Sequence, residues 1–286
     1  MISREGAVVR SGGIFGIDLG SRFTKVAVQA EGTYVRLEQY ETIAFYRQFG
    51  RRVGRKLAID LASVGVGTGD DVIATGYGRH TVGLPGFGGA PGEKAPPVRV
   101  IPELNAHVTG AIHQTGLRDF TLVDVGGQDT KVIQVRDGII TDFATNDRCA
   151  ASSGRYLENM ATALDVSLDE LGQHLDDPVD LNSTCAVFGE SELIGKIVEG
   201  YDLPSLCAGV NWSMWRRLRP HVEHLRSDVI VFVGGVARNA ALRTIVEREL
   251  RAKVIVPEHY GYNGAIGCCE SMAHQPATLT SLNRPQ

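Results

Sequence analysis

The sequence has no apolar run long enough to cross a membrane and no excess of positive charge. A membrane-spanning helix needs roughly 18 or more consecutive apolar residues, and no stretch of this chain approaches that length. Lysine and arginine number 29 against 33 aspartates and glutamates, which gives a formal net charge of -4. A chain with this balance presents no general cationic surface. We therefore expect a protein that engages neither membrane nor nucleic acid.

Cysteine is scarce and is not arranged as a disulfide framework. The five cysteines include no CxxC pair, and residues 1–13 contain no apolar signal core. An odd number of cysteines without an export signal predicts a cytoplasmic protein with reduced thiols or metal ligands. Two common phosphate-binding motifs are also absent: neither G-x-x-x-x-G-K followed by Ser or Thr, nor GxGxxG after a strand, occurs. A P-loop or a dinucleotide-type Rossmann site is therefore disfavoured.

Glycine, by contrast, is abundant, with 34 of 286 residues, or about 12% against a usual share of about 7%. Two glycine-containing segments form an internal repeat, since residues 16–26 and 122–132 align without a gap. Each segment predicts an apolar strand, a tight turn and a second strand, which together make a β-hairpin. Two such hairpins far apart in the sequence predict two related domains that face each other.

The rest of the chain mixes helical and strand patterns. Residues 229–233 are a short apolar strand that ends in Gly234-Gly235, and residues 83–97 predict a Gly/Pro-rich surface loop. The mixed order predicts α/β layers. Helical spacing occurs at 102–111, which would bridge the two domains, and at 155–164, 193–198 and 239–250.

The two hairpins carry the residue types that bind a polyphosphate and its metal. A glycine-containing turn leaves N–H groups accessible to phosphate oxygens, and an aspartate at a strand end can hold hydrated Mg²⁺. We expect Asp18 and Asp124 at the metal and Lys25 at a phosphate. The turns Gly20-Ser21-Arg22 and Gly126-Gly127 would grip the phosphates from both sides. Taken alone, either hairpin is explained equally well as an ordinary glycine turn in a sheet and as a phosphate-binding turn.

Two further features suggest a nucleotide. Gly234-Gly235, followed by Asn239, lets a flat ligand such as adenosine lie against the backbone, although a pair of helix-packing glycines explains the same residues. Gln128 follows the second glycine pair, and a side-chain amide there can orient a water toward the terminal phosphate. This position favours hydrolysis over phosphate transfer.

The combination resembles the actin-like ATPase superfamily, which includes sugar kinases and the ATPase domain of heat-shock chaperones. The resemblance covers most of the chain. It implies an α/β protein with two related actin-like (ribonuclease H-like) domains and a nucleotide cleft between them. We expect the first domain to comprise residues 1–107 plus 262–286 and the second to comprise residues 108–261.

Cys149 and Cys185 each lie where a helix is expected to begin. A helix N-terminus stabilises a thiolate by its unpaired N–H groups and its dipole. Two thiolates are half of the four that an iron–sulfur cluster or a structural zinc usually takes, so a metal here would sit between two subunits. Two small buried thiols explain the same residues, as we expect for Cys207, Cys268 and Cys269.

The segments around these two cysteines resemble the activators of 2-hydroxyacyl-CoA dehydratases and the ATPase subunits of benzoyl-CoA reductase. Residues 146–157 (NDRCAASSGRYL) and 183–194 (STCAVFGESELI) are similar to that family's N-D-K-C-A-A-G-T-G-R-F-L and S-T-C-T-V-F-A-E-S-E-V-I. Residues 75–79, 124–132 and 262–265 also look like this family. Departures fall at Ser152, Ser153, Tyr156, Ala186 and Gly189.

The resemblance implies an ATP-hydrolysing electron-transfer activator. Cys149 and Cys185 of each subunit would hold one 4Fe–4S cluster in a dimer with a second copy or a related ATPase subunit. Family members bind ATP, hydrolyse it to ADP and pass one low-potential electron to a partner iron–sulfur acyl-CoA dehydratase or reductase, with reduced ferredoxin or flavodoxin as donor. Two alternatives stay open: a small-molecule (sugar-type) kinase of the same superfamily, and a nucleotide-regulated interaction module that has lost hydrolysis.

Overall fold

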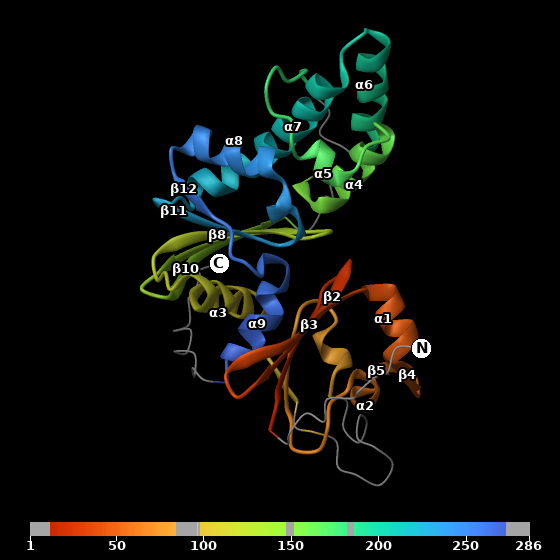
Figure 1. Cartoon of the computed structure of the whole chain (residues 1–286), viewed down its shortest axis with the longest axis vertical. Helices are drawn as coiled ribbons and strands as arrows, with labels where there is room; N and C mark the ends of the chain where they lie inside the picture. The colour runs from red at the N-terminus through yellow and green to blue at the C-terminus, as the bar shows by residue number, and fades with distance from the viewer. Residues whose placement is uncertain (1–11, 84–95, 97, 147–151, 182–185, 273–286) are drawn as a thin grey trace, which may run out of the picture.

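Two five-stranded sheets form the framework of the protein (Figure 1). The structure is a computed structural model that describes residues 12–83, 96, 98–146, 152–181 and 186–272, the side chains of 186 and 187 excepted. The first sheet has the order β3-β2-β1-β6-β7 and the second β10-β9-β8-β11-β12. The first comprises β1 (Ile14–Leu19), β2 (Phe23–Ala30), β3 (Thr33–Glu41), β6 (Asp71–Thr75) and β7 (Val98–Val100). The second comprises β8 (Phe120–Val125), β9 (Thr130–Arg136), β10 (Ile139–Asn146), β11 (Val229–Val233) and β12 (Lys253–Ile255).

The two sheets share one topology. In each sheet, three consecutive strands pair antiparallel. A later strand then pairs parallel with the first of the three, and a final strand pairs parallel with that later strand. The predicted hairpins are β1–β2 and β8–β9, which confirms the internal repeat as a structural repeat. Their registers match as well, since Asp18 pairs with Lys25 and Asp124 pairs with Lys131. The predicted α/β fold with two related domains is confirmed.

A helix pair lies between the two sheets: α3 (Glu103–Thr115) and α9 (Asn263–Glu270). α9 packs on β1 and β2, while Val108 and Ala111 of α3 join the apolar cluster of the second sheet. The two helices cross closely, because a Cβ on Gly267 would lie 1.7 Å from the Ala106 carbonyl oxygen. The domain boundary expected after His107 falls inside α3, so this helix is continuous between the two sheets.

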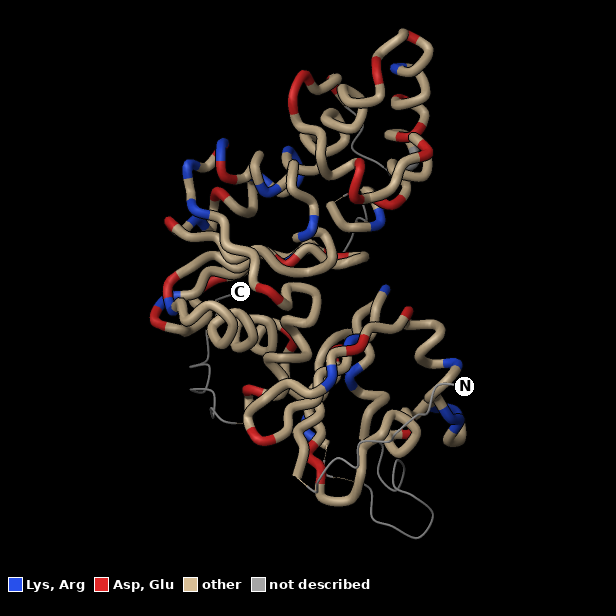
Figure 2. The backbone as a smooth tube through the Cα atoms, viewed as in Figure 1, with Lys and Arg blue, Asp and Glu red and all other residues tan. Residues whose placement is uncertain are grey.

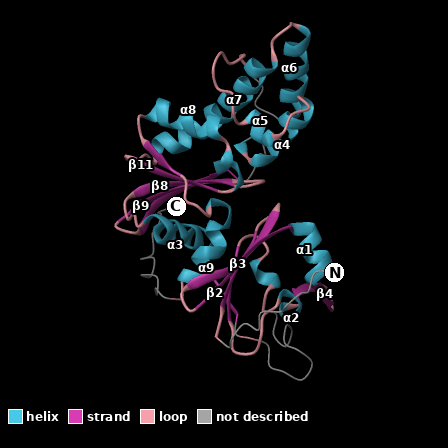
Figure 3. Cartoon of the chain, in the orientation of Figure 1, coloured by secondary structure: helices cyan, strands magenta, loops and turns pink. Residues whose placement is uncertain are grey.

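The remaining helices of the second domain lie on the opposite side of its sheet from α3 (Figure 3). α4 (Gly154–Ala163), α5 (Leu168–Leu171), α6 (Ala186–Val198) and α7 (Leu203–His224) follow β10, and α8 (Ala240–Leu250) follows β11. The predicted helices correspond to α3, α4, α6 and α8, and the predicted strand 229–233 is β11. α7 carries the buried Trp215, and its apolar side chains pack with those of α4 and α8 in one core cluster.

The first domain adds two short helices, α1 (Thr42–Phe49) and α2 (Leu61–Val64), and a small hairpin, β4 (Gly50–Val53) with β5 (Lys56–Ile59). A separate apolar cluster that includes Phe15, Ile17 and Phe45 forms its core. Residues of both charge signs are interspersed over the two domains (Figure 2). Among the described residues, no helix combines the length and apolar character that a membrane span requires.

Candidate functional site

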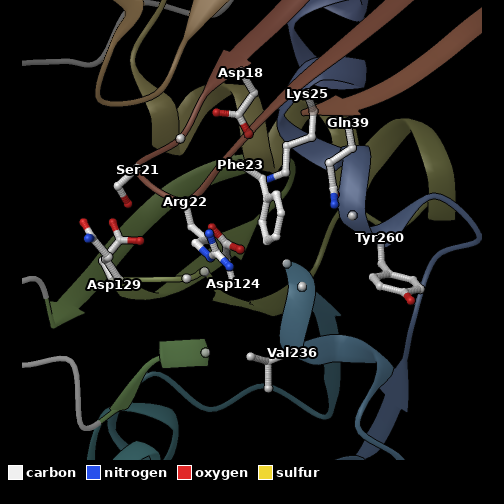
Figure 4. Close-up of a pocket in the computed structure, with 18 of the residues that line it drawn as sticks. Asp18, Ser21, Arg22, Phe23, Lys25, Gln39, Asp124, Asp129, Val236 and Tyr260 are labelled. Carbon is white, nitrogen blue, oxygen red and sulfur yellow. The ribbon is translucent and has the colours of Figure 1, made fainter. Parts of the chain in front are cut away.

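A cavity of about 770 Å³ opens between the two hairpins, and both domains line it. Its walls include the turns of β1–β2 and β8–β9, together with η3 (Gly235–Arg238) and η4 (Tyr260–Tyr262). Figure 4 shows Arg22, Phe23 and Lys25 reaching from the first hairpin toward the second domain. The site residues predicted outside the cysteine motifs all line this cavity: Asp18, Gly20, Ser21, Arg22, Lys25, Asp124, Gly126, Gly127, Gln128, Gly234, Gly235 and Asn239.

Two buried carboxylates, one from each domain, face the same histidine. Asp18 near the end of β1 is 4% exposed, and Asp124 near the end of β8 is 3% exposed. His107 of α3 lies between them, with Nε2 3.9 Å from Asp18 Oδ2 and Nδ1 3.5 Å from Asp124 Oδ2. Because α3 lies between the sheets, its histidine reaches the equivalent aspartate of both domains.

The charge of Asp124 is stabilised by its neighbours. Burial alone would raise the pKa of Asp124, but the adjacent His107, Lys131 and Lys25 side chains outweigh burial and hold the pKa below its usual value. Asp124 is therefore an anion at neutral pH, although almost none of its surface meets water. An anion held in this way is available to orient a bound cation or a hydrated metal.

Lys25 and Lys131 have equivalent registers and different surroundings. The Lys131 Nζ lies 2.6 Å from Asp129 Oδ2, 3.0 Å from Glu103 Oε1 and 3.8 Å from Asp124 Oδ2. Burial alone would lower the pKa of Lys131, but these carboxylates raise it above its usual range. Lys25 lines the cavity, and within the described part of the chain no ion pair ties it to a carboxylate. Lys25 is thus the lysine whose charge is available to an anionic ligand.

Glycine is required where the backbone approaches the site closely. A Cβ on Gly127 would lie 2.4 Å from Arg22 Cβ, so the two hairpin turns touch across the cavity. Gly234 has a φ of +83°, and a Cβ there would lie 2.5 Å from both Asp124 Oδ1 and the Val125 carbonyl oxygen. Both glycines therefore bring main chain against the opposing or adjacent hairpin, where a side chain would not fit.

One group of side chains in the cavity has the donor atoms of a metal site. Asp18, Glu103 and His107 each offer one ligand atom, and these atoms lie within 4.8 Å of one another. Asp18 Oδ1 and His107 Nδ1 are buried without a hydrogen-bond partner among the described residues. A buried anionic oxygen is costly without a partner, and a cation would supply one. The chemistry of this set fits a divalent metal.

Sequence reasoning missed Glu103 and His107. Both belong to the helix predicted at 102–111, and their spacing of four residues places them on one helical face. That spacing was a usable signal for a pair of ligands. What the sequence alone did not supply is the direction of this face, which points at Asp18 and Asp124 because α3 is packed between the two sheets.

Asn239 lines the cavity, but its side chain already caps α8. Its Oδ1 accepts a hydrogen bond from the Leu242 N–H at 2.8 Å, and its Nδ2 donates to Asn211 Oδ1 at 2.8 Å. The amide thus fixes the first turn of α8 directly behind the Gly234-Gly235 turn. A contact between Asn239 and adenosine stays a prediction.

Cys149 and Cys185, predicted as metal ligands, lie outside the described residues. The described chain resumes at Ser152, and α4 then begins at Gly154. The other three cysteines, Cys207, Cys268 and Cys269, are free and buried, as predicted. Burial raises the pKa of the Cys207 thiol to about 11 and that of Cys269 to about 12, so both are neutral core side chains at neutral pH.

The fold and the cavity define a two-domain actin-like protein with a nucleotide cleft. Residues 15–270 match the BadF/BadG/BcrA/BcrD ATPase family, and the chain belongs to this family. It is 32% identical over 258 residues to the activator of lactoyl-CoA dehydratase from Anaerotignum propionicum, which covers 88% of this chain and 94% of the relative. The resemblance inferred from the cysteine motifs is therefore confirmed.

Two solved structures are similar along most of the chain. Component A of the (R)-2-hydroxyglutaryl-CoA dehydratase from Acidaminococcus fermentans has a TM-score of 0.74 and 29% identity, and the match covers 91% of this chain and 97% of that one. The activator of the 2-hydroxyisocaproyl-CoA dehydratase from Clostridium difficile, solved with bound ADPNP, has a TM-score of 0.73 and 26% identity, covering 94% and 99%.

Proposed function

We propose that this protein is an ATP-hydrolysing iron–sulfur activator that drives a low-potential electron into a partner acyl-CoA dehydratase or reductase. The observation that carries the proposal is the cavity between two equivalent Asp-Gly-Lys hairpins in a member of the BadF/BadG/BcrA/BcrD ATPase family. Similarity to named dehydratase activators, one of them solved with an ATP analogue, supports this function.

In the proposed site, Mg²⁺ and the phosphates lie between the two hairpin turns. Asp18, with its unpartnered Oδ1, and Asp124 would lie at the metal as predicted, and Glu103 would add a further carboxylate, since Mg²⁺ prefers carboxylate oxygens and retains several waters. His107 would fix Asp18 and Asp124 relative to each other. Lys25 would neutralise phosphate charge, and the free N–H groups of the glycine turns would bind phosphate oxygens. Bound Mg²⁺ would disperse the charge that develops on the transferred phosphoryl group.

Gln128 is the proposed water-positioning residue. It is exposed on the cavity wall directly after Gly126-Gly127, where its amide can orient a water for attack. We expect Gln128→Ala to lower kcat for ATP hydrolysis about 100-fold while the Kd for ADPNP changes less than about threefold. The matched control is Gln39→Ala, because Gln39 lines the same cavity from β3. Equal losses of kcat and affinity would remove the role assigned to Gln128.

The cluster would be linked to the nucleotide site through α4. The N–H groups of Gly154 and Arg155 donate to the carbonyl oxygens of Gly126 and Gly127, at 2.8 and 3.0 Å. A movement of the second hairpin turn on nucleotide binding would therefore reach the start of α4, five residues after Cys149. Cys149 and Cys185 of two subunits would hold one 4Fe–4S cluster, which supplies the transferred electron.

The first test is anaerobic purification with iron and acid-labile sulfide analysis. We expect about two of each per subunit, from four per dimer, and their loss in the Cys149→Ala, Cys185→Ala double variant. Phosphate release from ATP without any added acceptor should accompany this result. Absence of iron after anaerobic reconstitution, with ADP formation that requires a hydroxyl acceptor and yields a phosphorylated acceptor in place of free phosphate, would favour the kinase alternative instead.

Assignment of the partners follows from the cluster. The second subunit would be another copy or a related ATPase subunit, and reduced ferredoxin or flavodoxin would be the electron donor. For the domains we retain residues 1–107 with 262–286 and residues 108–261, α3 and α9 being the helices at their junction. Analytical ultracentrifugation of the holoprotein, mixed with a candidate iron–sulfur dehydratase, tests two associations: that of the two ATPase subunits with each other and that of the ATPase with the dehydratase.

A further inference from the structure

Arg22 lies at the tip of the first hairpin and reaches the second domain. Its Nε is 3.5 Å from Glu158 Oε1 of α4, and its Nη1 is 3.6 Å from Glu41 Oε1 of β3. Arg22 and Glu158 both line the cavity, whereas Glu41 does not. A cation of one domain and an anion of the other thus face each other at the cavity wall, beside the contact between Arg22 and Gly127.

The ion pairs of Arg22 are loose and readily exchanged. The Arg22 side chain is 30% exposed, and its partners Glu158 and Glu41 are 27% and 61% exposed. Single contacts of this length between partly exposed groups contribute little to stability. A phosphate offers more charge and several oxygens, which a guanidinium binds in bidentate fashion. A phosphate placed near the hairpin tip would therefore displace Glu158 from Arg22.

We propose that Arg22 selects ATP over ADP by exchanging Glu158 for the terminal phosphate. This inference rests on the proposed function, because it requires the phosphates to lie between the two turns. With adenosine at Gly234-Gly235, the terminal phosphate is the one nearest the hairpin tips. ADP lacks this phosphate, so Arg22 keeps Glu158 as its partner when ADP is bound.

The exchange has a consequence for α4. Glu158 is on this helix, whose first N–H groups are bonded to the carbonyl oxygens of Gly126 and Gly127. When Arg22 leaves Glu158, the side-chain link between the first domain and α4 is broken, while the backbone link to the second hairpin persists. ATP therefore frees α4 from the first domain, and ADP does not.

The test is calorimetric titration of the full chain with Mg-ADPNP and Mg-ADP. We expect Arg22→Gln to weaken ADPNP binding at least about tenfold and to change ADP binding less than about twofold. Glu158→Gln should tighten ADPNP binding about two- to fivefold, because the competing carboxylate is gone. In the Arg22→Gln background the same Glu158→Gln change should have no effect. The matched control is Glu41→Gln, which removes the more exposed partner of Arg22 outside the cavity and should therefore change the ratio of the two affinities less than Glu158→Gln does.

Hydrogen exchange supplies an independent readout at α4. In the wild-type protein the amides of residues 157–163 should exchange faster with ADPNP than with ADP, and Arg22→Gln should abolish this difference. Two results would overturn the selection by Arg22: an Arg22→Gln variant that binds ADPNP and ADP more weakly by the same factor, or a Glu158→Gln variant with unchanged affinity for ADPNP. Neither result would contradict the proposal that the protein binds nucleotide. A wild-type protein that binds neither nucleotide would instead overturn the proposed function and this inference with it.

Discussion

The two phosphate-facing hairpins share a backbone and differ in how their charges are used. In β1–β2, Lys25 faces the cavity without a carboxylate partner among the described residues, and Asp18 keeps a buried oxygen unpartnered. In β8–β9, Lys131 is held by three carboxylates. Its neighbour Asp124 is stabilised as an anion by surrounding side chains.

The difference teaches that a structural repeat does not make its residues functionally equivalent. The first hairpin retains unsatisfied charge, which a metal and a phosphate can complete. In the second hairpin, Lys131 and Asp124 are already paired with side chains of the hairpin itself and of α3. Two features produce this asymmetry. Asp129 in the second turn lies 2.6 Å from Lys131 Nζ, whereas the repeat has Phe23 at the same position of the first hairpin, and α3 contributes Glu103 beside Lys131.

The largest expected effect comes from removing the second lysine. Lys131→Met should lower the free energy of unfolding by about 3 kcal/mol, because it leaves Asp124 and its neighbouring carboxylates without their buried counter-charge. Lys25→Met should change the free energy of unfolding by less than about 0.5 kcal/mol and weaken ADPNP binding about tenfold. Urea unfolding and calorimetric titration of both variants check this. A similar loss of unfolding free energy in the two variants would show that Lys25 and Lys131 contribute equally to stability, which would contradict the comparison.

Next in size is the contact between the two hairpin turns. Gly127→Ala should lower the free energy of unfolding by about 2 kcal/mol, since the new Cβ meets Arg22 Cβ at 2.4 Å. In an Arg22→Gly background the same change should cost less than about 0.5 kcal/mol. The control is Gly195→Ala on the exposed side of α6, where an added Cβ meets nothing within 4 Å. If Gly127→Ala lowers the free energy of unfolding by the same amount in the Arg22→Gly background, its effect does not come from the contact with the Arg22 side chain.

The smallest effect concerns pH. The pKa of Asp124 is lower in the native state than in the unfolded chain. At a pH between these two pKa values, the native state therefore binds fewer protons than the unfolded chain. Its contribution to stability is complete above the unfolded pKa of about 4 and is lost as pH falls through the native pKa. In urea titrations, the stability gap between wild type and Asp124→Asn should narrow below pH about 4. A gap that stays constant with pH would show that Asp124 gains nothing from its neighbours.

The sequence alone predicted the fold class, both hairpins and the glycine-containing turns that line the cavity, and it identified the family. These features were predictable because they are local. A strand, a glycine turn and a β-branched strand form a hairpin from their own residues, and a repeat of that pattern implies a repeat of the backbone. The buried state of Cys207, Cys268 and Cys269 was predictable for another reason: they lie outside the cysteine motifs, and a free cysteine is usually a core residue.

Tertiary structure decided how the charges of the site are shared. Lys25 and Lys131 align in the sequence, and the packing of α3 against the second sheet adds Glu103 to the carboxylates that surround Lys131. His107 lies 89 residues from Asp18 in the chain and faces it because α3 and α9 fit between the sheets. Electrostatic surroundings depend on distances between elements remote in sequence. Local pattern therefore determined the elements of this site, and packing determined their chemistry.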